Sequence, residues 1–151
     1  MPHTRASVIK RTIKEFQLLD KQVAKLKPAD WKRPLLRPET KDPWTIKDAL
    51  AHVTYWKANT LRVILKQPPR PAEAKLEITD LNRLIYKRWR RRTPKEILAW
   101  HRQVQKDLLK ALREVSADWF AGKNRGPDWP YDIDGHSTFH RLKDIARAVE
   151  K

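Results

Sequence analysis

The sequence predicts an all-α protein, and three observations support this fold class. Only 3 of the 151 residues are glycine, which is few for a β-rich fold whose tight turns need positive φ. Good helix formers dominate the composition. Apolar residues recur at helical spacing in four segments, separated by polar or proline-rich stretches. We therefore expect one domain over residues 1–151, built as a four-helix bundle.

The first two helices have clear boundaries. The first is expected over residues 6–27, because Pro28 cannot continue it. The second begins at Thr45, whose hydroxyl can cap the first turn while Asp48 completes a capping box, and it ends near Gln67. Their predicted core stripes are Ile9, Ile13, Phe16, Leu19, Val23 and Leu26, and then Ile46, Ala49, Val53, Trp56 and Ile64.

The third segment is expected over residues 80–115 and the fourth over residues 133–149. Asp80 is the predicted N-cap of the third, which pauses at Thr93 and restarts with Pro94 in the first helical position. The linker before Asp80 spans on the order of 40 Å when extended, so a long crossover between helices two and three is allowed. The predicted core stripes are Ile97, Trp100, Val104, Leu108, Ala111 and Val115, and then Phe139, Leu142, Ala146 and Val149.

Composition excludes several kinds of function. Without cysteine, the chain forms no disulfide and offers no thiolate to a metal. No apolar run approaches the roughly 20 residues of a membrane span, and no signal peptide is recognisable, so we expect a cytoplasmic protein without membrane contact. The net charge of +16 attracts phosphate-rich polymers, but an anionic small substrate or a solvated surface fits it equally.

Three histidines are candidate metal ligands. His136 and His140 lie four residues apart, so a helix places both imidazoles on one face, as in HxxxH metal sites. His52 flanks the core stripe of the second helix, beside a polar strip that includes Tyr55 and Asn59. This strip is either the lining of a pocket or an exposed face next to an ordinary buried histidine, and the pattern leaves both open.

Three stretches of the chain form a recognisable ordered set: PWTIKDALAHVTYW, DLNRLIYKRWRRRTPKEILAW and WPYDIDGHSTFHRLKDI. In sequence and order they resemble the DinB/YfiT-like metalloenzyme superfamily, and within it the ClbS/DfsB-type four-helix proteins. The resemblance implies an up-down-down-up bundle with a divalent ion held by His52, His136 and His140. Relatives often have an aromatic residue after the first histidine of the last motif and an acid before the second, where this chain has Ser137 and Phe139.

The resemblance further implies a metal-dependent hydrolase, or a transferase that uses a low-molecular-weight thiol, acting on a small electrophilic molecule. All-nitrogen ligation suits Zn, Ni, Fe or Co and disfavours Ca or Mg. Asp48 and Asp144 each lie four residues from a proposed ligand, so either could orient an imidazole or act as a general base. A capping role for Asp48 and an ion pair with a basic side chain for Asp144 are the preferred interpretations. His101 is interpreted as a core histidine.

The segment RLIYKRWRRR predicts an alternative function as a nucleic-acid-binding module with an empty or vestigial metal site. Basic groups interleaved with aromatic rings are typical of single-strand binders. The same aromatic residues can instead serve the core and leave the cations solvated. A homodimer, with or without chemistry, is also expected, because bundles often pair through an exposed helix face. The cations of this segment are Arg83, Lys87, Arg88, Arg90, Arg91 and Arg92.

Overall fold

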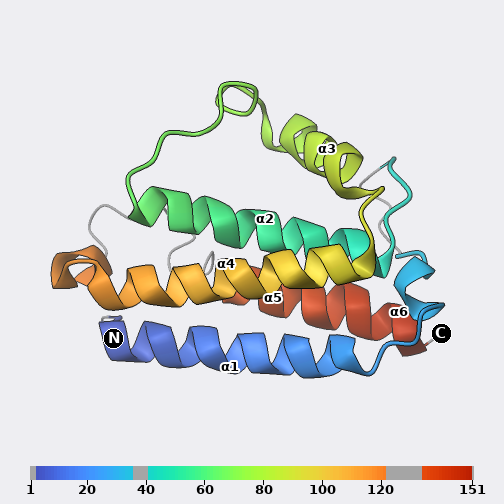
Figure 1. Cartoon of the computed structure of the whole chain (residues 1–151), viewed down its shortest axis with the longest axis horizontal. Helices are drawn as coiled ribbons and strands as arrows, with labels where there is room; N and C mark the ends of the chain where they lie inside the picture. The colour runs from blue at the N-terminus through green and yellow to red at the C-terminus, as the bar shows by residue number, and fades with distance from the viewer. Residues whose placement is uncertain (1–2, 36–40, 122–133, 151) are drawn as a thin grey trace.

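The computed structural model describes residues 3–35, 41–121 and 134–150, and these form an all-helical protein (Figure 1). Within those ranges only an isolated bridge between Pro34 and Thr45 is β-like, so the all-α prediction is confirmed. The helices are α1 (Arg5–Ala24), α2 (Ile46–Ile64), α3 (Ile78–Trp89), α4 (Pro94–Glu114), α5 (Gly135–His140) and α6 (Arg147–Glu150). Short 3-10 turns are η1 (Asp30–Lys32) and η2 (Ala117–Ala121), and a π-helical turn, η3 (Arg141–Ala146), joins α5 to α6.

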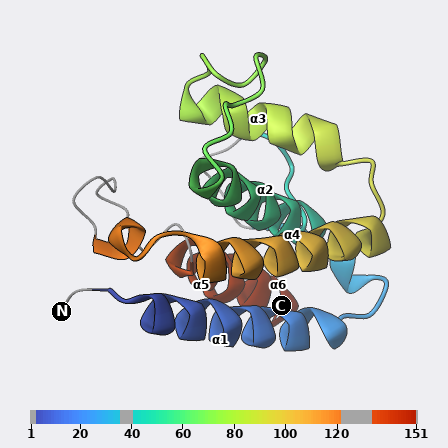
Figure 2. The ribbon, with the colours of Figure 1, turned by 60° about the vertical axis from the view of Figure 1, so that its left-hand side comes forward.

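Four rods lie side by side in the bundle. The colour gradient in Figure 1 shows that α1 and the continuous α5–η3–α6 rod run in one direction, and that α2 and α4 run in the other. Helix α3 lies across the outer side of α2, away from α1 (Figure 2). Helix α2 packs against α4, α3, α5 and η3, so it is the central element of the fold.

Helices α2 and α4 begin where the sequence predicted, and each begins with a capping box, of which the one at α2 was predicted. Thr45 and Asp48 form one at α2, where the Asp48 carboxylate accepts from the Thr45 backbone N–H at 2.9 Å. Thr93 and Glu96 form another at α4, with the Glu96 N–H donating to the Thr93 hydroxyl at 3.1 Å. These local signals fix where the first turn of each helix begins, because they satisfy backbone donors that have no partner within the helix.

The predicted third segment is two helices rather than one interrupted helix. Helix α3 begins at Ile78 after Glu77, so the predicted N-cap Asp80 was wrong and that residue lies inside the first turn. The chain leaves α3 after Trp89 and reverses direction before α4 starts at Pro94 (Figure 1). The break matters because α3 then covers α2 instead of extending the rod of α4.

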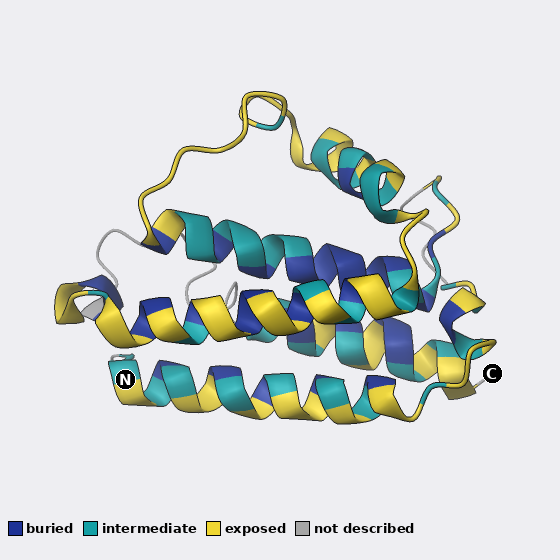
Figure 3. Ribbon diagram, in the orientation of Figure 1, coloured by how far each residue is buried: buried dark blue, intermediate teal, exposed yellow. Residues whose placement is uncertain are grey.

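The buried residues of the described ranges form two core clusters, and Figure 3 shows where buried positions lie along each helix. One is centred on α2 and the other lies near the C-terminal end of α4, beside the first turns of α1. The first contains Leu19, Val23, Trp31, Ile46, Ala49, Leu50, Ala51, Val53, Ile97 and Ile145. The second contains Val8, Ile64, Leu108, Ala111, Leu112, Trp119 and Phe120. None of the helices in the described ranges is long and apolar enough to cross a membrane.

Two of the predicted core stripes are rotated in the structure. The buried face of α1 includes Thr12 and Glu15, whereas Ile9, Ile13 and Phe16 are only half-buried. On the last rod, Phe139, Leu142 and Val149 are exposed to 46%, 48% and 40%. The inward positions there are Ser137, His140, Asp144 and Ile145. The apolar pattern was misleading because this part of the interior is polar.

A buried polar cluster joins α2 to α4 next to α1. The Lys57 ammonium, on a residue that is 3% exposed, donates to His101 Nε2 at 3.0 Å and to Gln105 Oε1 at 3.1 Å. Because an ammonium group has no acceptor, His101 Nε2 accepts and the ring proton is on Nδ1. Burial, with help from Lys57, lowers the pKa of His101 well below its ordinary value, which agrees with a neutral ring. His101 is therefore the core histidine that the sequence predicted.

Lys57 should make the stability of the protein depend on alkaline pH. Burial lowers the pKa of Lys57 to about 8, against the opposing effect of Glu15. Between about pH 8 and 10 the native state therefore sheds a proton that the unfolded chain keeps, and stability rises with pH by up to about 3 kcal/mol. Urea unfolding across this pH range measures the free energy of unfolding of wild type and of Lys57→Met. The value for wild type should increase relative to that of the variant as pH rises.

The control for this prediction is Lys106→Met, which removes an exposed lysine from the same bundle. Its unfolding free energy should follow that of wild type across the whole pH range. Parallel curves for wild type and Lys57→Met would show that Lys57 titrates in the native state as an ordinary lysine.

Candidate metal centre

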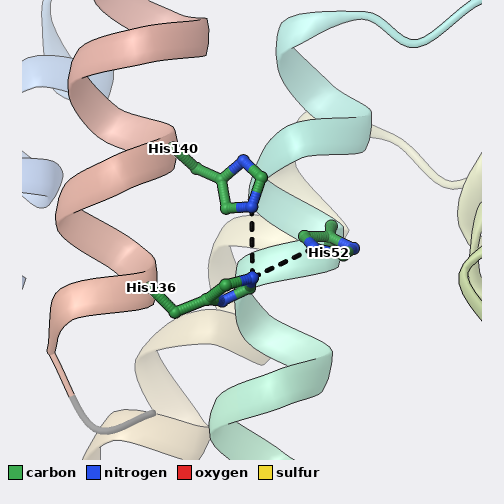
Figure 4. Close-up of side chains that lie close together, drawn as sticks. All are labelled: His52, His136 and His140. Carbon is green, nitrogen blue, oxygen red and sulfur yellow. Dashed lines mark hydrogen bonds between the residues drawn. The ribbon is translucent and has the colours of Figure 1, made fainter. Parts of the chain in front are cut away.

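Three histidine rings from two helices meet in the interior of the bundle (Figure 4). His136 Nε2 lies 3.1 Å from His52 Nε2 and 3.1 Å from His140 Nε2. The candidate ligand atoms of the three residues all lie within 4.8 Å of one another. His52 and His140 are buried and His136 is half-buried. The structure therefore brings together the three histidines that the sequence proposed.

The spacing of these nitrogens suits a shared transition-metal ion. Two imidazole nitrogens that each lie about 2.1 Å from one ion, at angles of 90–110°, are about 2.9–3.4 Å apart. The two observed separations of 3.1 Å fall inside this range. Three nitrogen donors and no thiolate are also the donor set that Zn²⁺ and its first-row neighbours accept. The residues present thus fit a divalent metal ion.

Two tryptophans of the second helical region border the cluster. The Trp44 ring centroid lies 4.9 Å from that of His52, and the Trp56 ring lies 6.4 Å from both His52 and His136. Trp44 lies just before Thr45, the N-cap of α2, and Trp56 follows His52 by four residues on the same helical face. These large rings exclude water from one side of the histidines and limit how far the imidazoles can rotate.

Asp144 orients one of the proposed ligands. Its carboxylate lies 2.5 Å from His140 Nδ1, and both side chains are buried. An Nδ1–H that donates to a carboxylate leaves Nε2 free of a proton and directed at the other histidines, as in carboxylate–histidine–metal arrangements. Orientation of His140 was the less favoured interpretation of Asp144, and it is the one that the structure supports. Asp48 contacts Thr45 instead, as its capping role required.

Removing the Asp144 carboxylate should weaken metal binding without abolishing it. Asp144→Ala is expected to lower the affinity for Zn²⁺ by about 10- to 100-fold, because His140 loses the group that fixes its tautomer. Asp144→Asn keeps an acceptor for the Nδ1–H and should lose less. Competition with a chromophoric chelator measures both. Equal affinities for wild type and Asp144→Ala would contradict an orienting role.

Arg11 and Glu15, one turn apart on α1, form hydrogen bonds and ion pairs with the start of the α5–η3–α6 rod. The buried carboxylate of Glu15 accepts from the Arg141 Nε–H at 2.8 and 3.1 Å, and lies 3.1 Å from the Ser137 hydroxyl and 2.9 Å from that of Thr138. Arg11 forms an ion pair with Asp134 at 3.1 Å. Three of these partners flank His136 and His140 in sequence, so α1 sets the position of both ligands.

Glu15 and Lys57 could not be recognised as buried from the sequence, because a single charged residue in an amphipathic helix is most often exposed. Ser137, which stands where relatives of the predicted superfamily often have an aromatic residue, contacts Glu15. Phe139, in the place of an acid in those relatives, is exposed. The sequence also allows Trp119 and Trp129, in the loop before the last helix, to close over a pocket near His136. Trp119 packs in the second core cluster instead, and Trp129 lies outside the described residues.

Tyr55 and Asn59 line a hollow of about 350 Å³ whose lining also includes Glu73, Arg88 and Trp100. The three histidines are not among its lining residues. Burial and the Glu73 carboxylate raise the pKa of Tyr55, so its phenol stays protonated at neutral pH. Tyr55 and Asn59 thus lie together in a hollow whose lining does not include the histidine cluster.

The basic segment is divided between ion pairs and free cations. Arg88 pairs with Glu73 at 2.7 Å, Arg92 with Glu96 at 3.2 Å and Arg83 with Asp42 at 3.8 Å. No carboxylate of the described ranges forms an ion pair with Lys87, Arg90 or Arg91. The interleaved aromatics pack inward: Trp89 stacks on Trp100 at 3.9 Å and Tyr86 lies parallel to Trp44 at 6.4 Å.

The fold and the site together define a helical-bundle protein with a three-histidine candidate metal centre. The chain belongs to the family of the mycothiol maleylpyruvate isomerase N-terminal domain, whose sequence profile matches residues 14–133. No curated protein matches the sequence significantly.

Two solved structures are similar to this chain in fold. The colibactin self-resistance protein ClbS, solved in complex with a double-stranded DNA, has a TM-score of 0.72 and 17% identity, with 99% of this chain and 96% of that chain covered. An uncharacterised protein from Escherichia coli UTI89 has a TM-score of 0.69 and 13% identity, with 99% and 89% covered. These likenesses support the DinB-like, ClbS-type fold that the sequence motifs predicted.

Proposed function

We propose that the protein is a metal-dependent enzyme that hydrolyses a small electrophilic molecule or transfers a thiol to it. The observation that supports this most is the convergence of His52, His136 and His140, with two Nε2–Nε2 separations of 3.1 Å. The chain would act as a single DinB-like domain over residues 1–151 with up-down-down-up topology and a long crossover between α2 and α4. The helix directions in Figure 1 support this topology.

The three imidazoles would hold a divalent ion of Zn, Ni, Fe or Co. When bound, such an ion supplies Lewis-acid activation of a water or thiol nucleophile. The protein's own contribution is positional. Asp144 fixes the tautomer of His140, Glu15 fixes the helix that carries two ligands, and Trp44 and Trp56 exclude water from one side. The name of the family contains mycothiol, a low-molecular-weight thiol, which supports thiol transfer beside hydrolysis.

Metal content and two model reactions test this proposal. Protein purified under metal-replete conditions should contain about one transition-metal ion per chain. His52→Ala should lose this ion, while His3→Ala, which removes a histidine near the N-terminus, should keep it. The metal-loaded protein should hydrolyse 4-nitrophenyl acetate or join L-cysteine to 1-chloro-2,4-dinitrobenzene, and His52→Ala should not. Wild type without stoichiometric metal would refute the proposal.

Binding to double-stranded DNA is the second candidate function. ClbS was solved with such a DNA, and this chain has a net charge of +16 with Lys87, Arg90 and Arg91 outside the described ion pairs. Because Trp89 and Tyr86 are packed against other rings, binding would rest on phosphate contacts rather than on base stacking. The alternative therefore predicts sequence-independent binding that weakens steeply with salt.

A salt series with fluorescent oligonucleotides separates this function from the enzymatic one. Affinity for a duplex that persists at about 150 mM salt, and that falls in Arg90→Gln/Arg91→Gln, supports DNA binding. If binding to the duplex is lost at this salt concentration, the net positive charge is a general property of the surface and DNA binding is not the function. The metal measurements are independent of either result.

We also propose that two copies of the chain pair through the last rod. Its exposed residues Phe139, Leu142 and Val149 lie at helical spacing and form an apolar stripe. Light scattering coupled to gel filtration should give the mass of a dimer for wild type and of a monomer for Leu142→Lys. A monomeric wild type would refute this proposal and leave the metal site unaffected.

A further inference from the structure

A second hollow, of about 930 Å³, lies at the end of the bundle where the end of α1 meets the starts of α2 and α4. Its volume is in the range of small-molecule sites. The histidines of the candidate metal centre are not among its lining residues. These are Leu26, Pro28, Trp31, Lys32, Pro43, Thr45, Lys47, Asp48, Tyr86, Arg90, Arg91, Arg92, Thr93, Pro94 and Lys95.

The apolar part of this hollow packs on the core of the bundle. Trp31 is buried against the α2 cluster, and Leu26 packs on the same cluster. Tyr86 lies nearly parallel to Trp44, with an angle of 4° between the rings, and Trp44 in turn contacts His52. Trp44 therefore lies between Tyr86, which lines this hollow, and His52 of the histidine cluster.

The lining carries six cationic side chains and one carboxylate. The cations are Lys32, Lys47, Arg90, Arg91, Arg92 and Lys95. The carboxylate, Asp48, already accepts from the Thr45 backbone N–H and hydroxyl at 2.9 Å. Within the described ranges no ion pair engages Lys32, Arg90, Arg91 or Lys95. The described residues thus leave an excess of positive charge along this hollow.

Lys47 fixes the backbone that carries the arginines. Its ammonium donates to the carbonyl of Arg90 and, at 2.7 Å, to the carbonyl of Arg92. The connection between α3 and α4 is thereby tied to the first turn of α2. The guanidinium groups of residues 90–92 consequently extend from a fixed backbone rather than from a free loop, which lowers the entropy cost of holding a ligand there.

We propose that this hollow binds an organic anion with a flat apolar body and a carboxylate, sulfonate or phosphate group. The apolar lining would take the body of the ligand, and the unpaired cations at the rim would take its charge. A polymer is the less suitable occupant, because the apolar surface is concave and its size matches one small molecule. The site is independent of the proposed metal centre and of its reaction.

Naphthalene-2-sulfonate, 2-naphthol and inorganic phosphate are the probes that test this site by isothermal titration calorimetry. Naphthalene-2-sulfonate has both the apolar body and the charge, whereas each of the other two has one of them. We expect measurable binding of the sulfonate and at least about tenfold weaker binding of the other two. Amide chemical shifts in two-dimensional NMR should change around Trp31, Thr45 and Lys95.

Two charge-matched variants separate this site from a general effect of the net charge. Arg91→Gln/Lys95→Gln removes two rim cations and should weaken sulfonate binding by about fivefold or more. Lys110→Gln/Arg113→Gln removes the same charges from exposed positions at the other end of α4 and should leave the binding unchanged. Equal weakening in both variants, or equal binding of 2-naphthol and the sulfonate, would overturn the proposal.

Two further experiments test whether this site is separate from the metal centre and whether it binds a small anion or DNA. Binding of the sulfonate by His136→Ala at wild-type affinity supports an independent site, and its loss in that variant would overturn the independence. Competition by a duplex at lower concentration than the sulfonate, with shifts of the same amides, would identify the hollow as part of a DNA surface and overturn the small-anion assignment.

Discussion

Replacing His136 by Ala is expected to lower the affinity for Zn²⁺ by more than about 100-fold. This exceeds the loss typical of removing a residue, such as Asp144, that only hydrogen-bonds to a metal ligand. His136 Nε2 lies 3.1 Å from the Nε2 atoms of both His52 and His140, so its removal leaves two donors and takes away the ring that contacts both of them. Chelator competition and calorimetry on the metal-free protein measure the change.

The stability of the metal-free protein is the control for His136→Ala. Because His136 is only half-buried, the metal-free variant should unfold within about 1 kcal/mol of metal-free wild type. In the presence of Zn²⁺ only wild type should gain stability, since a ligand that binds the native state raises its unfolding free energy. Wild-type affinity in the variant would mean that the three rings do not act as one site.

Replacing Glu15 by Ala should destabilise the protein by about 3 kcal/mol or more, as removal of one partner from a buried ion pair does. The Arg141 guanidinium, whose side chain is 15% exposed, would lose its carboxylate, and the hydroxyls of Ser137 and Thr138 would lose an acceptor. Because these residues flank two proposed ligands, metal affinity should fall as well. Urea unfolding and chelator competition give the two numbers.

Asp20→Ala is a matched control on the same helix. Asp20 pairs with Arg102 at 3.2 Å, but this pair is largely exposed, and exposed pairs contribute at most about 1 kcal/mol. Asp20→Ala should therefore unfold close to wild type and bind metal normally. Similar stability losses for Glu15→Ala and Asp20→Ala would show that the Glu15 contacts do not fasten the last rod.

Local sequence signals were sufficient for the starts of α2 and α4 and for part of the site. The predicted Thr45–Asp48 box depends on residues three apart, and the predicted His136–His140 pair on residues four apart. The Thr93–Glu96 box and the His140–Asp144 contact have the same spacings, but the first was not predicted and the second was the less favoured interpretation. Such relations are fixed once a helix forms, because helical geometry sets which side chains share a face. The same reasoning could not separate α3 from α4, since a break at Pro94 allows either a kink or a reversal of the chain.

By itself, the amino-acid sequence determined the fold class, the starts of α2 and α4 and the pairing of His136 with His140. Only the tertiary structure decided that His52 lies 3.1 Å from His136, 84 positions along the chain, and that Glu15 and Lys57 face inward. It also decided that the last rod exposes Phe139 and Leu142. The physical reason is that a polar interior inverts the usual rule of amphipathic helices: once neighbouring helices supply hydrogen-bond partners, burying the polar face is the stable choice.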